Sequence, residues 1–179
     1  VHRLDKDTSG LMVVARQRQS MDLLVTLIAE RKMHREYVAW GQGAWKGASV
    51  REVSAPIGRD PRNRLRMAVV DLEKQAGKTA LTRITAMKTT ASHCLVRCKL
   101  HTGRTHQIRV HMASLGHPLV SDEVYGGARA GGLERQALHA VSLGFEHPVT
   151  GEELRFESAP PADLQAAMVE LGLIYNQKQ

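Results

Sequence analysis

The middle of the chain consists of short apolar runs that are separated by turn residues. Within these runs apolar and polar residues alternate, or β-branched residues follow one another, as is typical of strands, and Gly, Pro, Asn and Asp lie between them. The pattern therefore predicts a mostly antiparallel sheet. We expect strands at residues 11–15, 35–40, 50–55, 67–70, 79–87, 93–100, 138–145 and 153–157.

Three other segments repeat their apolar residues at helical spacing. The first begins at Ser20, which can cap a helix, and ends at the basic pair Arg31 and Lys32, which suits the negative end of the helix dipole. The second and third cover residues 105–115 and 161–171, and each is followed by a glycine. Strands interleaved irregularly with three helices predict an α+β fold, in which helices flank a mixed, mostly antiparallel sheet.

The composition fits a single domain over residues 1–179. Hydrophobic residues make up 42% of the chain, which is enough for one core, and Cys94 and Cys98 lie in a strand-like run where we expect buried, reduced thiols. No apolar run reaches membrane-spanning length and no signal peptide is visible, so we expect a cytoplasmic monomer. The chain opens at Val1 without Met, and we expect that an N-terminal portion of the domain is missing.

Basic residues outnumber acidic ones. Lys and Arg number 25, Asp and Glu number 18, and the formal net charge is +7. This excess favours a polyanionic partner such as nucleic acid. The chain has only two Trp, three Tyr and two Phe, so extensive base stacking on aromatic side chains is not expected.

Asp5 lies in a dense polar stretch near the start of the chain. The stretch reads His2-Arg3-Leu4-Asp5-Lys6-Asp7-Thr8-Ser9-Gly10 and places this carboxylate between cationic side chains. Such surroundings favour an ionised carboxylate, which can serve as a nucleophile or as a base. An isolated Asp in a turn of this kind can instead be a capping residue that accepts hydrogen bonds from nearby backbone N–H groups.

A second dense stretch covers residues 100–111 and leads from a predicted strand into a predicted helix. The N–H groups at a helix start and the cationic side chains around them suit a phosphate or a carboxylate. The alternative is an amphipathic helix with a solvated basic face. Three histidines recur at every fifth position, which spreads them around a helix, and no HExxH pattern accompanies them, so we expect no metal site.

Together these stretches resemble the RluA-type RNA pseudouridine synthases, most closely the ribosomal large subunit pseudouridine synthase D subgroup. The family signature HRLDxxTSGL is unbroken over residues 2–11, and TGRTHQIRxH is unbroken over residues 102–111. The pattern GHPLxxDxxYGG follows at residues 116–127 and includes Asp122 and Tyr125. The resemblance covers nearly the whole chain. In this subgroup a small RNA-binding domain often precedes the catalytic domain, and we expect weak activity without it.

The resemblance implies roles for particular residues. Asp5 matches the catalytic aspartate, Arg109 the arginine that pairs with it, and Arg3 a residue implicated in displacing the target uridine. Tyr37 matches the active-site tyrosine of a KxY-like motif, in which Arg35 replaces the frequent Lys. Without the resemblance, a core residue of a strand would be the better explanation of Tyr37. The further substrate-binding residues expected from the second motif are Arg104, His106 and Gln107.

Several arginines crowd one loop-like segment beside Pro61 and Asn63. A solvated loop would explain them, but the net charge and the resemblance favour contacts with RNA phosphates, which position RNA without reading its sequence. The arginines for which we expect this role are Arg62, Arg64 and Arg66.

The function implied by the resemblance is the isomerisation of uridine to pseudouridine in structured RNA, with 23S ribosomal RNA as the expected substrate. The reaction breaks the glycosidic bond, rotates the uracil and rejoins it through carbon 5, after the base has left the RNA stack. We expect neither cofactor nor metal. The alternatives are a transfer RNA pseudouridine synthase and a non-catalytic RNA-binding or ribosome-assembly module.

Overall fold

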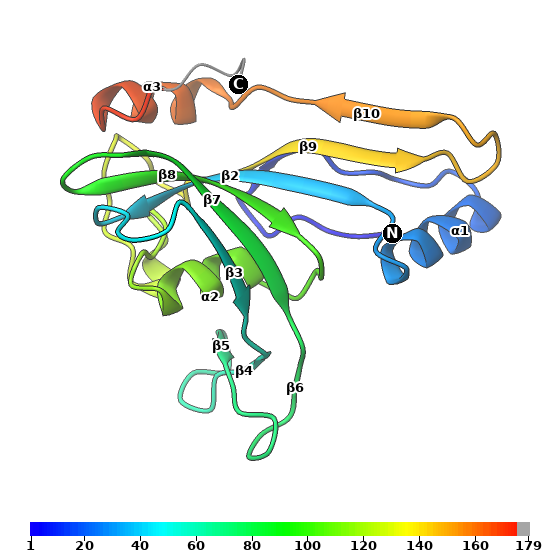
Figure 1. Cartoon of the computed structure of the whole chain (residues 1–179), viewed down its shortest axis with the longest axis horizontal. Helices are drawn as coiled ribbons and strands as arrows, with labels where there is room; N and C mark the ends of the chain where they lie inside the picture. The colour runs from blue at the N-terminus through cyan, green and yellow to red at the C-terminus, as the bar shows by residue number, and fades with distance from the viewer. Residues whose placement is uncertain (175–179) are drawn as a thin grey trace.

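The computed structural model describes residues 1–174 and contains a seven-stranded sheet (Figure 1). Its strand order is β1-β9-β2-β8-β7-β3, and β10 also pairs with β9. Only β1 and β9 are parallel among the paired strands of this sheet within residues 1–174. The predicted α+β fold on a mixed, mostly antiparallel sheet is therefore confirmed. The strands are β1 (Ser9–Gly10), β2 (His34–Gln42), β3 (Val50–Ser54), β7 (Leu81–Thr89), β8 (His93–Leu100), β9 (Leu138–Glu146) and β10 (Glu153–Glu157).

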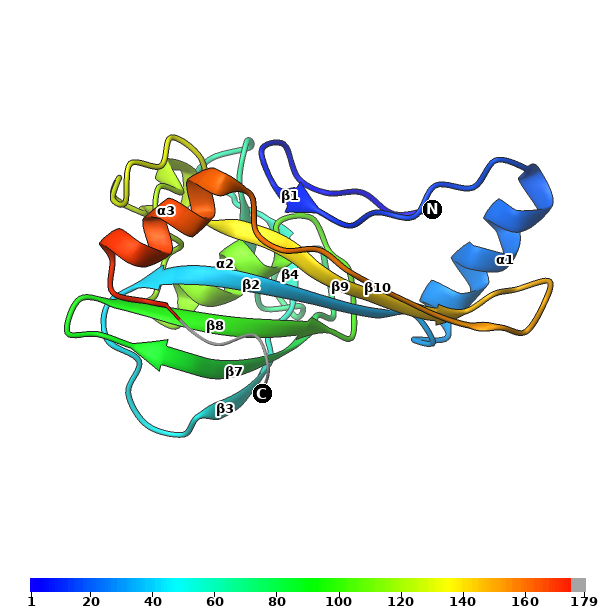
Figure 2. The same ribbon diagram turned by 90° about the horizontal axis from the view of Figure 1, so that it is seen from above.

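The helices cover both faces and one end of this sheet. Helices α2 (Gln107–Ser114) and α3 (Ala162–Glu170) lie on opposite faces, whereas α1 (Arg18–Ala29) lies near the turn between β9 and β10 (Figures 1 and 2). A short 3-10 helix, η1 (Glu123–Tyr125), follows α2. None of the helices in residues 1–174 is long and apolar enough to cross a membrane.

Strand β2 is buried on both faces because its alternating side chains enter two different cores. Tyr37 packs in the cluster that contains Met112 of α2, whereas Val38 and Trp40 pack in the cluster that contains Leu164 of α3. Successive side chains of a strand point to opposite faces, so one central strand can support both layers. This arrangement explains why residues 37–40 in the middle of the strand are apolar without a break.

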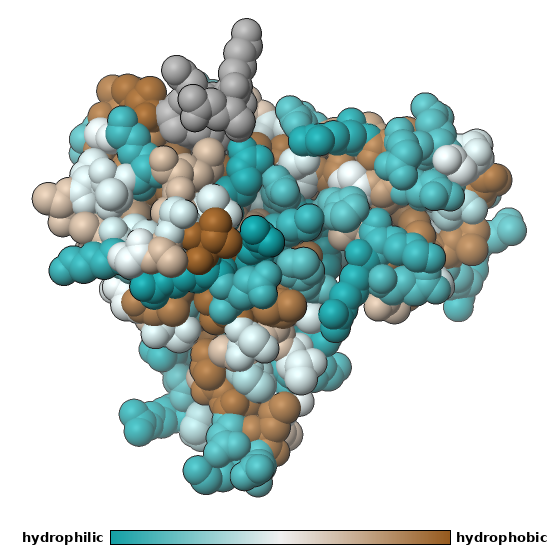
Figure 3. Space-filling view, viewed as in Figure 1, coloured by the Kyte–Doolittle hydropathy of each residue, from teal (hydrophilic) through white to brown (hydrophobic). Residues whose placement is uncertain are grey.

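A second, three-stranded sheet projects from the side of the main sheet that α2 covers (Figure 1). It consists of β4 (Ile57–Arg59), β5 (Met67–Val69) and β6 (Gly77–Lys78), in the order β5-β4-β6. We call residues 57–69 the arginine hairpin. Hydrophilic residues cover much of the end of this projection (Figure 3), and its apolar side packs against Val110 and Tyr125.

The predicted strand at residues 11–15 is wrong. The pairing with β9 is limited to Ser9 and Gly10, apart from one bond from the N–H of Leu11 to the carbonyl of Ala140 at 3.0 Å. Gly10 has φ 109°, and a Cβ built there would lie 2.2 Å from the Ala140 oxygen. The alternation at residues 11–15 is present as half-buried and exposed positions, but β10 pairs with β9 from Ser142 onward, so that edge of β9 is occupied and no ladder forms with residues 11–15.

Other predicted elements differ from the structure mainly at their ends. The first helix begins at Arg18 with Gln17 as its N-cap and no side-chain cap bond, so Ser20 lies inside the helix and does not cap it. Strands β4 and β6 were missed because three and two residues are too few to form a pattern. The expectation of buried thiols is confirmed, because Cys94 and Cys98 are both buried and free.

Candidate active site

Asp5 lies in a turn that is held against the residues preceding β9. Its carbonyl accepts a hydrogen bond from the N–H of Thr8 at 3.0 Å, and Asp7 within the turn has φ 68°. Gln136 donates from Nε2 to the carbonyl of Lys6 at 2.6 Å and to Oγ1 of Thr8 at 3.2 Å. These bonds hold the backbone on the C-terminal side of Asp5, so the carboxylate has a defined position although it belongs to no helix or strand.

A buried arginine of α2 lies beside this carboxylate. Nη1 of Arg109 is 3.7 Å from Oδ2 of Asp5, while Nε and Nη2 donate to the two oxygens of Asp122 at 2.7 and 2.8 Å. The side chains of Arg109 and Asp122 are 6% and 1% exposed. Burial disfavours the charge of Arg109, but Asp122 and Asp5 outweigh burial and raise its pKa. The bidentate pair with Asp122 therefore orients the guanidinium so that its remaining nitrogen faces Asp5.

Tyr125 of η1 connects this arginine with the arginine hairpin. Its ring centroid is 4.9 Å from the guanidinium carbon of Arg109, which is within the range of a cation–π contact. Its hydroxyl accepts a hydrogen bond from the N–H of Met67 at 3.0 Å and lies 2.7 Å from Nδ1 of His106. Burial lowers the pKa of His106, so its ring is neutral at pH 7 and Nδ1 can accept a hydrogen bond from the Tyr125 hydroxyl. The ring proton then resides on Nε2.

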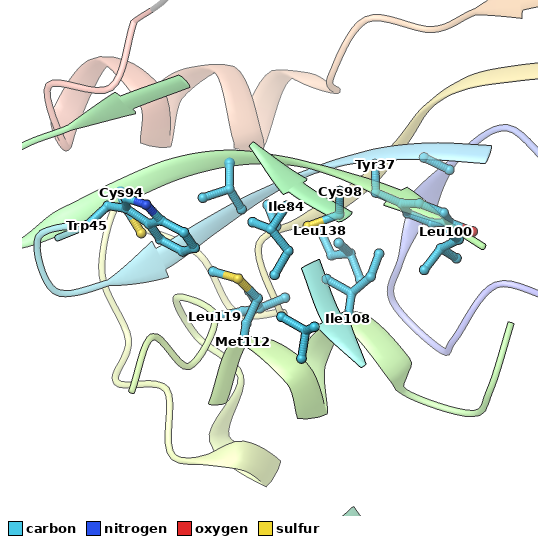
Figure 4. Close-up of a cluster of buried hydrophobic side chains, with 14 residues drawn as sticks. Tyr37, Trp45, Ile84, Cys94, Cys98, Leu100, Ile108, Met112, Leu119 and Leu138 are labelled. Carbon is cyan, nitrogen blue, oxygen red and sulfur yellow. The ribbon is translucent and has the colours of Figure 1, made fainter. Parts of the chain in front are cut away.

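A cavity of about 200 Å³ lies next to Asp5. Tyr37 and Leu100 contribute to its wall, and they also form one end of the core cluster whose other end is Trp45 (Figure 4). Sites for drug-sized ligands have volumes of roughly 300–1,000 Å³, so this smaller cavity suits a single base. Burial raises the pKa of Tyr37, against the effect of nearby Arg35, so the phenol is protonated at neutral pH.

The structure brings most of the predicted site residues together around this cavity. Arg3, Asp5, Tyr37, Arg104, His106 and Gln107 all line it. Arg104 donates from Nε to the carbonyl of Thr79 at 2.9 Å, which holds its side chain along the rim. Gln107 differs from the others, because its amide bonds to Thr102, Thr82 and two backbone groups and so shapes the loop from within the protein.

The three predicted arginines of the hairpin are not equivalent. Arg62 and Arg64 are exposed in the loop between β4 and β5. Nε of Arg66 lies 3.2 Å from Oδ2 of Asp60, and its guanidinium carbon lies 5.7 Å from the ring centroid of Tyr125. Arg66 therefore already has partners within the protein, whereas the other two face solvent.

The assignment of site residues from the sequence missed three polar residues. Asp122 and Tyr125 both belong to the third motif, and their fixed spacing after the second motif was the available signal. Arg35 lines the cavity and is buried, but it was noted only as a replacement for Lys. Within residues 1–174, no three or more His, Cys, Asp or Glu side chains are grouped so that they could hold a metal ion.

The site thus combines an arginine-held carboxylate, a base-sized cavity with a tyrosine in its wall, and an adjoining basic hairpin. This combination is typical of proteins that act on a single nucleotide of a nucleic acid. The chain belongs to the RNA pseudouridylate synthase family, whose model matches residues 1–114. The resemblance found in the sequence motifs is therefore confirmed.

Individual relatives agree with this family. The chain is 46% identical, over 96% of its length, to "Ribosomal large subunit pseudouridine synthase D" of Xanthomonas campestris pv. campestris, and 46% identical, over 93% of its length, to the protein of that name from Vibrio parahaemolyticus. It covers 54% and 53% of these proteins, so the chain spans about half the length of the curated relatives it matches.

Two solved structures share the fold. Human RNA Pseudouridylate Synthase Domain Containing 1 has a TM-score of 0.74 and 30% identity, and the match covers 89% of this chain and 68% of the human chain. Human RNA Pseudouridylate Synthase Domain Containing 4 has a TM-score of 0.76 at 24% identity, covering 96% and 74% of the two chains. At the latter identity the similarity concerns the fold alone.

Proposed function

We propose that this protein isomerises uridine to pseudouridine in structured RNA, with 23S ribosomal RNA as the substrate and the cytoplasm as the place of action. The observation that carries the proposal is the position of Asp5, 3.7 Å from the buried guanidinium of Arg109 and in the wall of a cavity of about 200 Å³. The names of the bacterial relatives support ribosomal RNA as the substrate.

In this proposal Asp5 acts on the ribose of the target nucleotide. The carboxylate either attacks carbon 1′ or removes a ribose proton, and both routes require its ionised form. Nη1 of Arg109 lies 3.7 Å from this carboxylate, and Asp122 keeps Arg109 oriented through the two bonds described above. The uracil leaves carbon 1′ through N1, rotates and rejoins through carbon 5, so the reaction involves no net oxidation and requires neither cofactor nor metal.

Tyr37 is proposed to hold the flipped base and to assist the loss of the carbon 5 proton. Its ring lines the cavity and can stack on the uracil. Because burial raises the pKa of Tyr37, the phenol starts the reaction protonated and acts as a proton relay rather than as a phenolate base. Arg3 is exposed at the same cavity, where it can displace the uridine from the RNA stack.

The arginine hairpin is proposed to contact the RNA backbone outside the cavity. Arg62 and Arg64 are exposed and can each neutralise a phosphate. Tyr125 joins the hairpin to the site through its bond from Met67. RNA bound along the hairpin would thereby be held in a fixed position relative to Asp5.

Release of tritium from carbon 5 of labelled uridine tests the proposal. We expect the full-length protein to release tritium from 23S ribosomal RNA, and we expect no release by Asp5→Asn. Release from transfer RNA alone would show that transfer RNA is the substrate, and the proposed enzymatic activity would stand. Binding of RNA without release by the wild type would overturn the proposed activity in favour of a non-catalytic RNA-binding module.

A further inference from the structure

Arg35 is a buried cation without a partner among residues 1–174. The residue lies in β2, is 6% exposed, and its Nε is enclosed without any hydrogen-bond partner in residues 1–174. Burial lowers the pKa of Arg35, yet an arginine side chain keeps its proton in proteins. Arg109 is equally buried but has two carboxylates beside it. An unpaired buried charge destabilises a fold, so its presence indicates a role outside folding.

A second unpartnered donor lines the same cavity. Nε2 of His2 accepts a hydrogen bond from the backbone N–H of Val13 at 3.2 Å, so the proton of the neutral ring resides on Nδ1. This Nδ1 is enclosed and has no partner within residues 1–174. Burial and the charge of Arg35 lower the pKa of His2 to about 4, so the ring is neutral at pH 7. Arg35 and His2 thus both present donors that lack an acceptor in the described part of the chain.

The neighbouring backbone leaves room for the Arg35 guanidinium. A Cβ at Gly103 would lie 2.7 Å from Nη1 of Arg35, so a side chain at this position would displace the guanidinium. Arg104, the next residue, also lines the cavity. The described residues therefore provide a glycine-walled recess with several donors and no acceptor for them, and a ligand in the cavity can supply that acceptor.

The position of Arg35 relative to Tyr37 indicates which part of a ligand would supply the acceptor. The two residues are separated by one residue of β2, and the irregularity in the β2–β9 pairing skips Val141 of β9, so Arg35 and Tyr37 project from the same face of β2. Their Cα atoms are therefore about 7 Å apart along the strand. A base that stacks on Tyr37 would have its own backbone phosphate within reach of Arg35.

We propose that Arg35 and His2 form a phosphate subsite inside the cavity, and that it binds one of the two phosphates flanking the target nucleotide. This inference rests on the proposed function, because it takes the occupant of the cavity to be a nucleotide of an RNA chain. Arg35 holds the phosphate through charge-assisted hydrogen bonds, and the Nδ1–H of His2 adds a neutral donor. The subsite ties the flipped nucleotide to the wall that carries Tyr37.

Neutral phosphate analogues test the subsite directly. A short RNA containing the target uridine is prepared with a methylphosphonate at either flanking phosphate, and its Kd is measured with wild type, Arg35→Met and a control. The control is Arg83→Met, at an arginine of β7 whose side chain is 51% exposed. We expect one of the two methylphosphonates to raise Kd about 10-fold or more with wild type and Arg83→Met. With Arg35→Met, Kd is already raised and the same methylphosphonate has no further effect. Equal effects in all three proteins would overturn the subsite.

Thermal unfolding without RNA provides a second measurement. Because Arg35→Met removes an unpaired buried charge, we expect Tm to rise by about 2 °C or more. Inorganic phosphate, compared with chloride at matched ionic strength, should raise Tm more for wild type and Arg83→Met than for Arg35→Met. An equal phosphate effect on all three proteins would contradict the inference, and Arg35→Lys should retain part of the wild-type effect.

These outcomes are separable from those that test the proposed function. If the wild type released tritium but a methylphosphonate affected Kd equally in wild type and Arg35→Met, the subsite would be refuted and the proposed activity would stand. If the effect of the methylphosphonate depended on Arg35 but the wild type released no tritium, the subsite would be supported and the proposed activity refuted.

Discussion

Asp5 depends on neighbouring residues for its position. The N–H of Thr8 donates a hydrogen bond to the carbonyl of Asp5, and Gln136 donates one to the carbonyl of Lys6. We expect Asp5→Asn to abolish tritium release while Kd for RNA stays within a few-fold of wild type. The amide has the same shape and can occupy the same turn, but it has lost the carboxylate's reactivity. Tritium release and gel-shift affinity measure the two effects, and repeated turnover by Asp5→Asn would show that another residue carries the chemistry.

The pair of Arg109 and Asp122 is expected to matter for stability as well as for catalysis. Arg109→Met leaves the carboxylate of Asp122, 1% exposed, without its cation, and we expect the free energy of unfolding to fall by about 3–5 kcal/mol. The double variant Arg109→Met/Asp122→Leu should recover part of this loss, because it buries no unpaired charge. Urea unfolding provides the measurement.

An exposed ion pair provides the control for this prediction. Arg129 and Glu123 lie 2.6 Å apart with side chains 62% and 64% exposed, so Arg129→Met should change stability little. If the double variant were as unstable as Arg109→Met, the loss would come from packing rather than from the unpaired carboxylate.

Tyr37 should separate binding from proton loss. Tyr37→Phe keeps the ring that can stack on uracil but lacks the hydroxyl, so we expect nearly normal RNA affinity, cleavage of the glycosidic bond and almost no tritium release. An RNA adduct is expected to accumulate. Tyr37→Ala should also bind RNA more weakly, by about 1–3 kcal/mol. Near-normal tritium release by Tyr37→Phe would leave Tyr37 as a stacking or core residue.

At the scale of elements, the arginine hairpin carries exposed cations and is anchored to the rest of the protein through Arg66. Arg62 and Arg64 face solvent, whereas Arg66 contacts Asp60 and Tyr125. We expect Arg62→Ala and Arg64→Ala each to reduce the slope of log K against log salt concentration by about 0.7–0.9, because each lost phosphate contact releases fewer counterions. Arg66→Ala should have a smaller effect on this slope.

The matched control is Arg155, an exposed arginine of β10, which pairs with Glu157 at 3.0 Å. Arg155→Ala should leave the salt slope unchanged. If the hairpin variants also left it unchanged, the segment would be a solvated loop.

At the scale of the whole molecule, buried neutral histidines make stability depend on pH. Burial lowers the pKa of His111 and His139, and burial together with Arg35 lowers that of His2 to about 4. An unfolded chain takes up these protons near pH 6.5. Between pH 6.5 and about 4 the unfolded state therefore binds more protons, and stability that is complete above pH 6.5 is lost as the pH falls.

Urea unfolding measured between pH 7.5 and 4.5 should show this loss. His139 accepts a bond from Ser9 and bonds to the carbonyl of Ser158, and His139→Gln removes the titrating ring. We expect the variant to be less stable at pH 7.5 but to depend less steeply on pH. A wild-type stability that stayed constant or rose toward pH 4.5 would contradict the prediction.

The amino-acid sequence by itself determined the local elements and much of the site. Strands β8 and β10 have the predicted bounds, because alternation and flanking turn residues are local properties of the chain. The motifs also indicated that Asp5, Tyr37 and Arg109 belong to one site, and the structure places them around one cavity or against it. The roles of these residues in the reaction stay predictions.

Only the tertiary structure decided which groups lack or find partners. Ser9 bonds to His139, 130 residues away, and β10 occupies the edge of β9 from Ser142 onward, so β1 has two residues and the predicted strand at residues 11–15 does not form. Asp122 becomes the main partner of Arg109, and Arg35 is enclosed without one in residues 1–174. Such relations depend on contacts between distant segments and on the exclusion of water, which periodicity along a chain does not encode.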